Sequence, residues 1–148
     1  MATSDQRSAL EDKAVIRETL LRYAAGVDRK DWGLMSTCFT ADCTGVWNGV
    51  ELNGIQAIVD YINQAASLFT VLGAMHMLTN IYVELDGDTA RAETYAFSSL
   101  AADQDGEVFL RLRGLRYRDT LVRRDGDWLI QHRDLSADWE TRTPAVVP

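Results

Sequence analysis

The side chains best suited to proton transfer or metal binding are few in this chain of 148 residues. His76 and His132 are the only histidines, and Cys38 and Cys43 are the only cysteines. No zinc-type His-Glu-x-x-His pattern, disulfide framework or paired cysteine pattern is present, so we expect free thiols and no bound metal. The glycine-rich loops of nucleotide enzymes and the G-x-S-x-G turn of serine hydrolases are absent too. Whatever chemistry exists must therefore use ordinary side chains, such as a neutral imidazole acting as a base.

Other polar side chains could contact a substrate. Tyr23 falls on an apolar helical stripe, where its hydroxyl could donate to a substrate oxygen or bond to backbone. Strand aromatics, with Asn80, could line a pocket or simply pack. An arginine cluster on one strand could form an anion patch. Strand alternation spreads it over both faces, and the surrounding acids outnumber it, so we expect these side chains to be solvated and paired with acids. The cluster comprises Arg111, Arg113, Arg116, Arg118, Arg123 and Arg124.

Helical periodicity fills the first half of the chain. An apolar stripe predicts a first helix that stops near Gly26; the stripe consists of Ile16, Leu20, Tyr23 and Val27. Asp31 is the expected N-cap of a short second helix that includes Phe39. A third helix is expected to open at Asn53, with Gln56 completing a variant of the capping box.

Strand alternation fills the second half. Asn48-Gly49 predicts an early hairpin, and after Gly73 four strands are expected to form a meander over residues 74–85, 89–100, 108–124 and 128–136. In the first of these, strict alternation places His76 and Asn80 on one face and Met75 on the other. We expect an α+β fold in a single domain, residues 1–148, with loosely held ends at about 1–7 and 143–148.

Composition narrows the possible partners. Hydrophobic residues make up 47% of the chain, and the net charge is -7. Such a chain can form a core, but its charge repels nucleic acid and anionic membranes. No apolar run approaches the roughly 20 residues that cross a bilayer, and the N-terminus has no apolar signal core. We expect a cytoplasmic protein that binds neither nucleic acid nor membrane.

Three segments carry a resemblance to a known family. They read AVIRETLLRYAAGVDRKDWGLMSTCFTADC, HMLTNIYVELDGDTARAETY and RYRDTLVRRDGDWLIQHRDL. Together they resemble the SnoaL-like branch of the nuclear-transport-factor-two-like superfamily. The resemblance implies a cone, in which a strongly curved antiparallel sheet wraps against three N-terminal helices and encloses a pocket. Scytalone dehydratase, hexachlorocyclohexane dehydrochlorinase, polyketide cyclases and members without catalysis share this fold, so the site must be argued separately.

The resemblance also implies a general-base pair. Dehydratase members place an aspartate at the end of the first helix and a histidine early in the first long strand, and Asp28 and His76 fill these positions. A carboxylate fixes the imidazole tautomer and stabilises the imidazolium. The alternatives are a solvated or capping Asp28 and a packed core His76. On an ideal helix Asp28 lies roughly 100° round from Val27, so it is expected to reach a pocket only if the helix ends near Gly26.

The remaining site residues also follow from the resemblance. Arg133 matches a cavity arginine that stabilises a leaving group, although an ordinary ion pair is the alternative. Tyr23 matches an oxyanion-hole tyrosine, whereas Trp47 occupies the position of the isomerase base and argues against that mechanism. With Asn80 these residues are the expected substrate-binding set.

Function is expected to be that of a cofactor-independent lyase of the dehydratase type, acting on a small, uncharged, mostly apolar cyclic or polyketide-like molecule. A cyclase or isomerase using the same pocket is one alternative, and a non-catalytic binding or subunit-interaction module is another. Relatives pair or form trimers through the outer sheet face, which implies a homodimer or homotrimer.

Overall fold

A computed structural model describes the backbone of residues 4–147 and the side chains of residues 8–147. Helices come mostly first along this part of the chain and long strands follow, which confirms the α+β class. The helices are α1 (Ser4–Arg29), α2 (Trp32–Ser36) and α3 (Ile55–Ala66). The strands are β1 (Phe39–Trp47), β2 (Val50–Asn53), β3 (Thr70–Asp86), β4 (Thr89–Gln104), β5 (Glu107–Arg124) and β6 (Asp127–Pro144). Among the described helices, none is long and apolar enough to cross a membrane.

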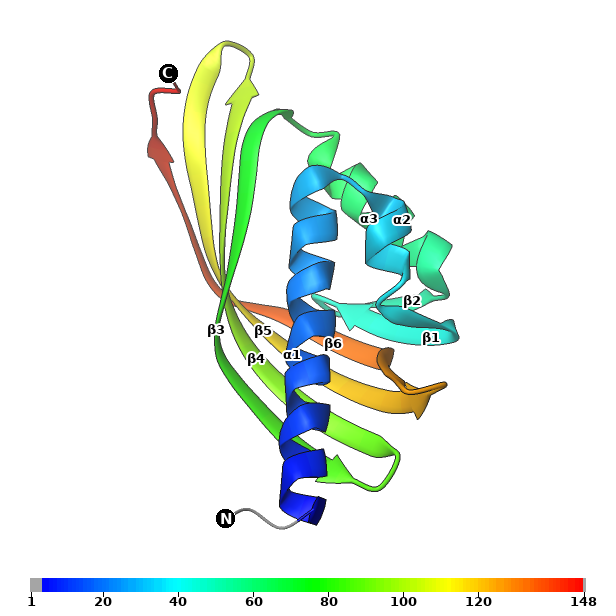
Figure 1. Ribbon diagram of the computed structural model, residues 1–148. Coiled ribbons are helices and arrows are strands. Elements are labelled where there is room, and N and C mark those ends of the chain that lie inside the picture. Colours follow the sequence, from blue (N-terminus) through cyan, green and yellow to red (C-terminus); the bar gives the residue numbers. More distant parts are fainter. Residues whose placement is uncertain (1–3, 148) are drawn as a thin grey trace.

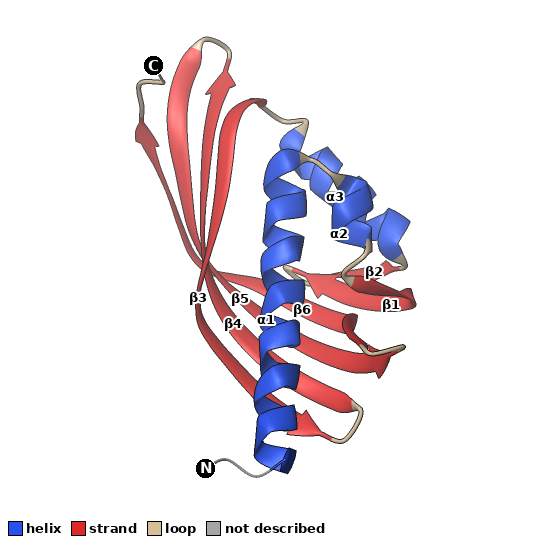
Figure 2. Ribbon diagram, viewed as in Figure 1, coloured by secondary structure: helices blue, strands red, loops and turns tan. Residues whose placement is uncertain are grey.

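One curved sheet carries all six strands, in the order β2-β1-β6-β5-β4-β3. The three helices lie on the same side of it, and α1 runs along the hollow of the curve (Figure 1 and Figure 2). This arrangement confirms the implied cone. The sheet is mixed rather than purely antiparallel, because β1 and β6 run parallel. Phe39 opens β1 instead of ending α2, and its strand joins the early hairpin to the meander.

The first helix does not stop at Gly26. It ends at Arg29, where Lys30 takes a left-handed φ of 54° and donates its N–H to the Val27 carbonyl. The Asp31 N–H donates to the Gly26 carbonyl at 2.8 Å, which completes a Schellman-type end. Gly26 serves packing instead, because a Cβ there would lie 2.8 Å from the Met35 backbone nitrogen of α2. The helix therefore fixes Asp28 in its last turn.

Local capping was predicted well at α2 and poorly at α3. The Asp31 carboxylate accepts the Leu34 N–H at 2.9 Å, which confirms the expected N-cap. The capping box expected at α3 is wrong: Asn53 ends β2, Gly54 is the N-cap without a side-chain bond, and the Gln56 side chain binds Asp60. The Asn53 side chain is therefore not needed to start α3.

Secondary structure extends into both segments that were expected to be loosely held. Residues 143–144 pair with β5, and the Ala145 N–H donates to the Val108 carbonyl, within the tail 143–148. At the other end, residues 4–7 belong to α1, while residues 1–3 and 148 lie outside the described part of the chain.

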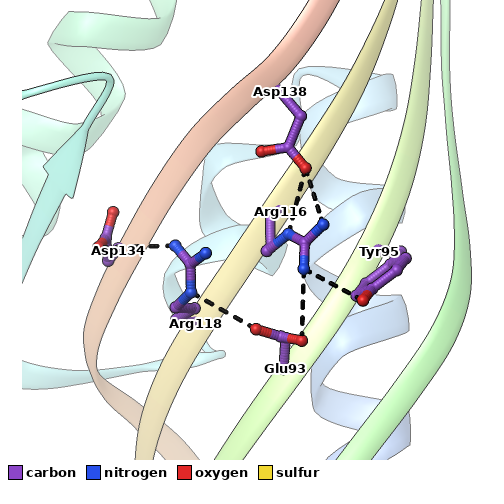
Figure 3. A network of polar contacts seen from close by, with 6 residues as sticks. All are labelled: Glu93, Tyr95, Arg116, Arg118, Asp134 and Asp138. Atoms are coloured by element: carbon purple, nitrogen blue, oxygen red, sulfur yellow. Dashed lines mark hydrogen bonds and ion pairs between the residues drawn. The ribbon is translucent and has the colours of Figure 1, made fainter.

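On the face turned away from α1, the sheet carries charge pairs and an apolar patch. Arg116 binds Asp138 at 2.9 Å and contacts Glu93, and Arg118 lies between Glu93 and Asp134 (Figure 3). These two arginines confirm the expected solvated strand face. Beside them lie exposed apolar side chains: Met75, Met77 and Trp139. The homodimer or homotrimer through this face remains a prediction.

Asp12 joins α1 to the far end of the sheet. Its carboxylate accepts hydrogen bonds from the Arg123 guanidinium at 2.7 and 2.6 Å and from the Trp128 indole at 3.0 Å. The hydrogen bond from Arg123 lowers the pKa of Asp12 below its usual value of 3.8. A carboxylate with a lowered pKa stabilises the folded state above pH 3.8, and this stabilisation is lost as the pH falls through the lowered pKa.

Replacing Asp12 with asparagine is expected to lower the free energy of unfolding by about 1.5–3 kcal/mol at neutral pH, the range for hydrogen bonds to charged groups. Urea unfolding monitored by circular dichroism measures the difference. The difference in free energy of unfolding between wild type and the variant should shrink as the pH falls below the usual pKa of a carboxyl group, because the Asp12 carboxylate then becomes protonated. Exposed Glu11 provides the matched control, Glu11→Gln. Equal losses in the two variants would contradict the role of Asp12.

Candidate active site

A pocket of about 220 Å³ lies between the ends of α1 and α3 and the concave face of the sheet. Its size is below the range of about 300–1,000 Å³ typical of drug-sized ligands, which suits a compact molecule. Its walls include five aromatic side chains: Tyr23, Trp32, Trp47, Tyr61 and Tyr117. Among the described residues that line it, the side chains that ordinarily titrate near neutral pH or carry a charge are His76, Lys30, Arg111 and Arg113.

Asp28 and His76 are in direct contact at this pocket. The Asp28 Oδ1 lies 2.6 Å from the His76 Nδ1, and Oδ2 accepts the His76 backbone N–H at 3.0 Å. One carboxylate thus fixes both the ring and the strand that carries it. The exposed fractions of the two side chains are 12% for His76 and 23% for Asp28. The pair is partly shielded from solvent, and the imidazole lines the pocket.

Asp28 reaches His76 although the helix continues past Gly26, which the ideal-helix expectation did not allow for. Asp28 extends the i, i+4 row of Leu20 and Ala24, both buried, rather than the Tyr23 and Val27 row. β3 packs alongside α1, so this second row faces the strand. The helix therefore uses one row for the sheet core and the neighbouring row for His76.

The contact determines which imidazole nitrogen can act as a base. An ionised carboxylate only accepts hydrogen bonds, so the Nδ1 nitrogen beside Asp28 carries the proton. The neutral ring then keeps its lone pair on Nε2. This is the tautomer that a general base needs, with an anion placed to stabilise the imidazolium once a proton is taken.

Tyr23 and Trp47 both lie at the pocket and are almost fully buried. The rings of Phe39 and Tyr117 contact Tyr23 edge-on, each with its centroid 5.9 Å away. Burial raises the pKa of Tyr23, so its hydroxyl stays protonated at neutral pH and can donate. The structure therefore brings Tyr23, Trp47 and the Asp28–His76 pair to one cavity.

Asn80 does not join them. The pairing of β3 with β4 shifts between Leu78 and Ile81, and this irregularity breaks the period-two alternation. His76 and Leu78 face inward before it, whereas Ile81 and Val83 face inward after it. Asn80 is exposed and does not line the pocket. The strict alternation expected over residues 74–85 is wrong for this reason.

Arg133 lies beneath the pocket instead of lining it. Its Nε and one terminal nitrogen donate to Asp119 at 2.7 and 2.8 Å, and both side chains are fully buried. The guanidinium carbon lies 4.0 Å from the Tyr23 ring centroid and 4.5 Å from that of Tyr117. The ion pair weighed as the alternative is thus present, and Arg133 supports two aromatic walls of the cavity rather than reaching a ligand.

Sequence reasoning considered an anion patch on β5 but favoured a solvated face, and so did not place its arginines in the pocket. Arg111 and Arg113 line it, contrary to the expectation of a fully solvated arginine cluster, and Lys30 joins them from the end of α1. The sequence held a signal for this placement, because period-two alternation puts Arg111 and Arg113 on the same face of the strand as Leu115 and Tyr117. Those apolar residues identify the inward face. Ser98, opposite His76 and Arg113 in the strand register, is another missed lining residue.

Within the described residues, no three His, Cys, Asp or Glu side chains gather as a metal site. Cys38 and Cys43 are free and buried, as expected of unpaired thiols. Burial raises the pKa of both thiols, which disfavours the reactive thiolate. Neither cysteine lines the pocket.

Comparison with known proteins places the chain in a family. The terrestric acid biosynthesis cluster protein E of Penicillium crustosum is 31% identical over 140 residues, covering 88% of this chain and 86% of the relative. A hexachlorocyclohexane dehydrochlorinase from Novosphingobium barchaimii superposes with a TM-score of 0.80 at 19% identity, covering 95% of this chain and 97% of that structure.

A structure assigned as a scytalone dehydratase from Novosphingobium aromaticivorans gives a TM-score of 0.79 at 18% identity, covering 96% of this chain and 93% of the other. At such identities the structures show a shared fold. The family model for the SnoaL-like domain matches residues 8–134. The chain therefore belongs to the SnoaL-like domain family.

Proposed function

We propose that the protein is a small-molecule-processing enzyme, a lyase of the dehydratase type, in which His76 is the general base and Asp28 orients it. The observation that carries the proposal is the 2.6 Å contact between Asp28 Oδ1 and His76 Nδ1 at the wall of an aromatic pocket. A positioned base contributes about 10²–10⁴-fold to proton transfer. The dehydratase and dehydrochlorinase names of structural relatives agree with this chemistry.

The proposed step conserves oxidation state and needs no cofactor. The His76 Nε2 takes a proton from a carbon next to an activating carbonyl, and the electron pair of that C–H bond forms a C=C bond. The C–O bond on the neighbouring carbon breaks, and the departing hydroxide takes the proton back from the imidazolium. Water leaves and the base is restored. The Tyr23 hydroxyl can donate to the carbonyl oxygen, where negative charge develops.

Pocket size and lining define the proposed substrate class. Five aromatic side chains and a volume of about 220 Å³ favour a compact, planar molecule of one or two rings. Such a cavity could equally support ring closure by the same base, as in a cyclase or isomerase. A non-catalytic binding module would use the cavity without proton transfer.

The test uses 5-nitrobenzisoxazole, a planar two-ring carbon acid. A base removes its ring C–H proton, the N–O bond breaks, a nitrile forms and the oxygen leaves as a coloured phenolate. The wild-type protein is expected to accelerate this reaction above the rate in buffer, and His76→Ala is expected to return it to that rate. His132→Ala is the matched control, because the His132 Nδ1 lies 2.8 Å from Thr44 Oγ1 and the residue does not line the pocket.

Circular dichroism and the unfolding midpoint establish that each variant is folded. Equal rates for wild type and His76→Ala would contradict the proposed base and favour a binding module. A wild-type rate no higher than the rate in buffer would also contradict the proposed base and favour a binding module.

A further inference from the structure

The pocket has a charge opposite to that of the whole chain. The protein carries 22 acidic residues against 15 lysines and arginines. Yet among the described residues that line the pocket there are Lys30, Arg111 and Arg113 and no aspartate or glutamate. Cations gathered in a partly enclosed, apolar cavity produce a strong local positive potential. This potential attracts an anion.

Arg113 has no direct partner among the described residues, and only the nearby charge of Glu140 partly offsets its own. Within residues 8–147, it makes neither a hydrogen bond nor an ion pair through its guanidinium. Burial, followed by the charge of Arg111, lowers the pKa of Arg113. A guanidinium in such surroundings is costly unless a counter-charge completes it. Its donors border a cavity, so a ligand can supply that counter-charge.

The neighbouring carboxylate is already engaged. Glu140 faces Arg113 across the β5–β6 pairing, but its Oε2 accepts a hydrogen bond from Arg111 at 2.6 Å. The Arg111 Nε is buried and has no partner among the described residues. Two adjacent guanidiniums therefore retain donors at the same wall of the pocket.

The strand register gives the spacing between this wall and the base. His76 pairs with Ser98, and Ser98 pairs with Arg113, so one strand separates the imidazole from the guanidinium. Two strand spacings correspond to roughly 10 Å between the backbones. A flat ring lying over Ser98 can span that gap, with one edge near the imidazole and an anionic oxygen on the guanidinium.

We infer that the pocket binds a compact aromatic or conjugated ligand with an anionic oxygen, such as a carboxylate or an acidic enol, held by Arg113. The inference deepens and rests on the proposed function, since it names the substrate class of the same cavity. It departs from the uncharged substrate expected from sequence. A carboxylate matches the paired N–H groups of a guanidinium, and the aromatic walls match a flat ring.

Calorimetric titration with isosteric acid and amide pairs tests the inference by binding alone. The pairs are 2-naphthoate with 2-naphthamide and benzoate with benzamide. Wild type is expected to bind the acid about 10- to 100-fold more tightly than the amide, the factor that hydrogen bonds to a charged group supply. Arg113→Gln should remove this preference, and Arg113→Lys should retain part of it because charge remains without the planar fork.

Arg118→Gln is the control from the same strand, because Arg118 lies on the opposite face, paired with Glu93. It should leave the preference unchanged. Equal affinity for acid and amide in wild type, no binding of either acid, or an unchanged preference in folded Arg113→Gln would each overturn the inference. His76→Ala should keep the preference for the acid, because the imidazole is not part of the anion site. If wild type binds the acids but catalyses no elimination, the proposed lyase is contradicted and the anion site still stands.

Discussion

Asparagine in place of Asp28 is expected to lower the catalysed elimination of 5-nitrobenzisoxazole by about 10²–10⁴-fold, although the imidazole remains. In the native protein, the two Asp28 oxygens accept from the His76 ring and from the His76 backbone. An asparagine offers one oxygen and one NH₂ group in place of the two carboxylate oxygens, and the His76 backbone N–H needs the oxygen as its acceptor. The NH₂ group would then donate to Nδ1 and favour the wrong tautomer, and no anion would stabilise the imidazolium.

The measurement is kcat/KM for wild type and Asp28→Asn, with unfolding midpoints to separate catalysis from stability. Asp31→Asn makes the same chemical change three residues later, at a position where asparagine is an equally good helix cap. Asp31→Asn is expected to retain the wild-type rate. If Asp28→Asn also keeps a rate within about threefold of wild type, the carboxylate is a structural tie between α1 and β3 and not part of the base.

Features set by local sequence were predictable. Three residues of the α1 stripe are buried and Val27 is half-buried. The Asp31 cap is present, and Asn48-Gly49 turns β1 into β2 with positive φ at both residues. Each follows from the spacing of side chains or from turn chemistry within a few residues. The end of α1 was missed because Lys30, not a glycine, takes the left-handed conformation there.

Features set by distant contacts were not predictable in the same way. The parallel pairing of β1 with β6 joins residues far apart in the chain, and no local pattern encodes it. The irregular pairing near Asn80 reverses strand parity without a glycine or proline to mark it. Period-two reasoning carried across that point therefore turned Asn80 inward, where the structure exposes it.

The candidate site shows the same division. Asp28 and His76 were identified through the family resemblance, and their contact depends on how α1 packs beside β3. Arg133 was matched to a cavity arginine through the resemblance, with an ion pair as the alternative, and the ion pair is present. Its depth was not foreseen, because sequence cannot tell a layer beneath the pocket from the pocket wall. Arg111 and Arg113 were assigned to solvent because alternation spreads the arginine cluster over both faces of the strand and acids surround it. Leu115 and Tyr117 lie on the same face of the strand, and their apolar side chains indicate that this face turns toward the pocket.

The buried pair of Arg133 and Asp119 supports the pocket from below, and its disruption is expected to be the most destabilising single change. Both side chains are fully buried and joined by two hydrogen bonds. Burial alone would lower the pKa of Arg133, but the Asp119 charge offsets it and the pKa is raised, so the guanidinium stays charged. Asp119→Asn would leave that charge buried without a counter-ion.

Asp119→Asn should therefore lower the free energy of unfolding by about 3–5 kcal/mol, a large share of the roughly 5–15 kcal/mol that holds a domain folded. Urea unfolding measures this loss. Asp134→Asn is the matched control: Asp134 lies 4.0 Å from Arg118 on the exposed face, where an ion pair contributes about 0–1 kcal/mol.

The double variant Asp119→Leu/Arg133→Met separates charge from packing. Because apolar residues of similar size can replace a buried ion pair with little loss, it should regain most of the stability that Asp119→Asn loses. Asp119→Asn alone could instead lower the free energy of unfolding by less than about 1 kcal/mol. The Tyr23 and Tyr117 rings over the guanidinium would then stabilise the Arg133 charge without the carboxylate. In that case the aromatic walls, and not the ion pair, would support the floor of the pocket.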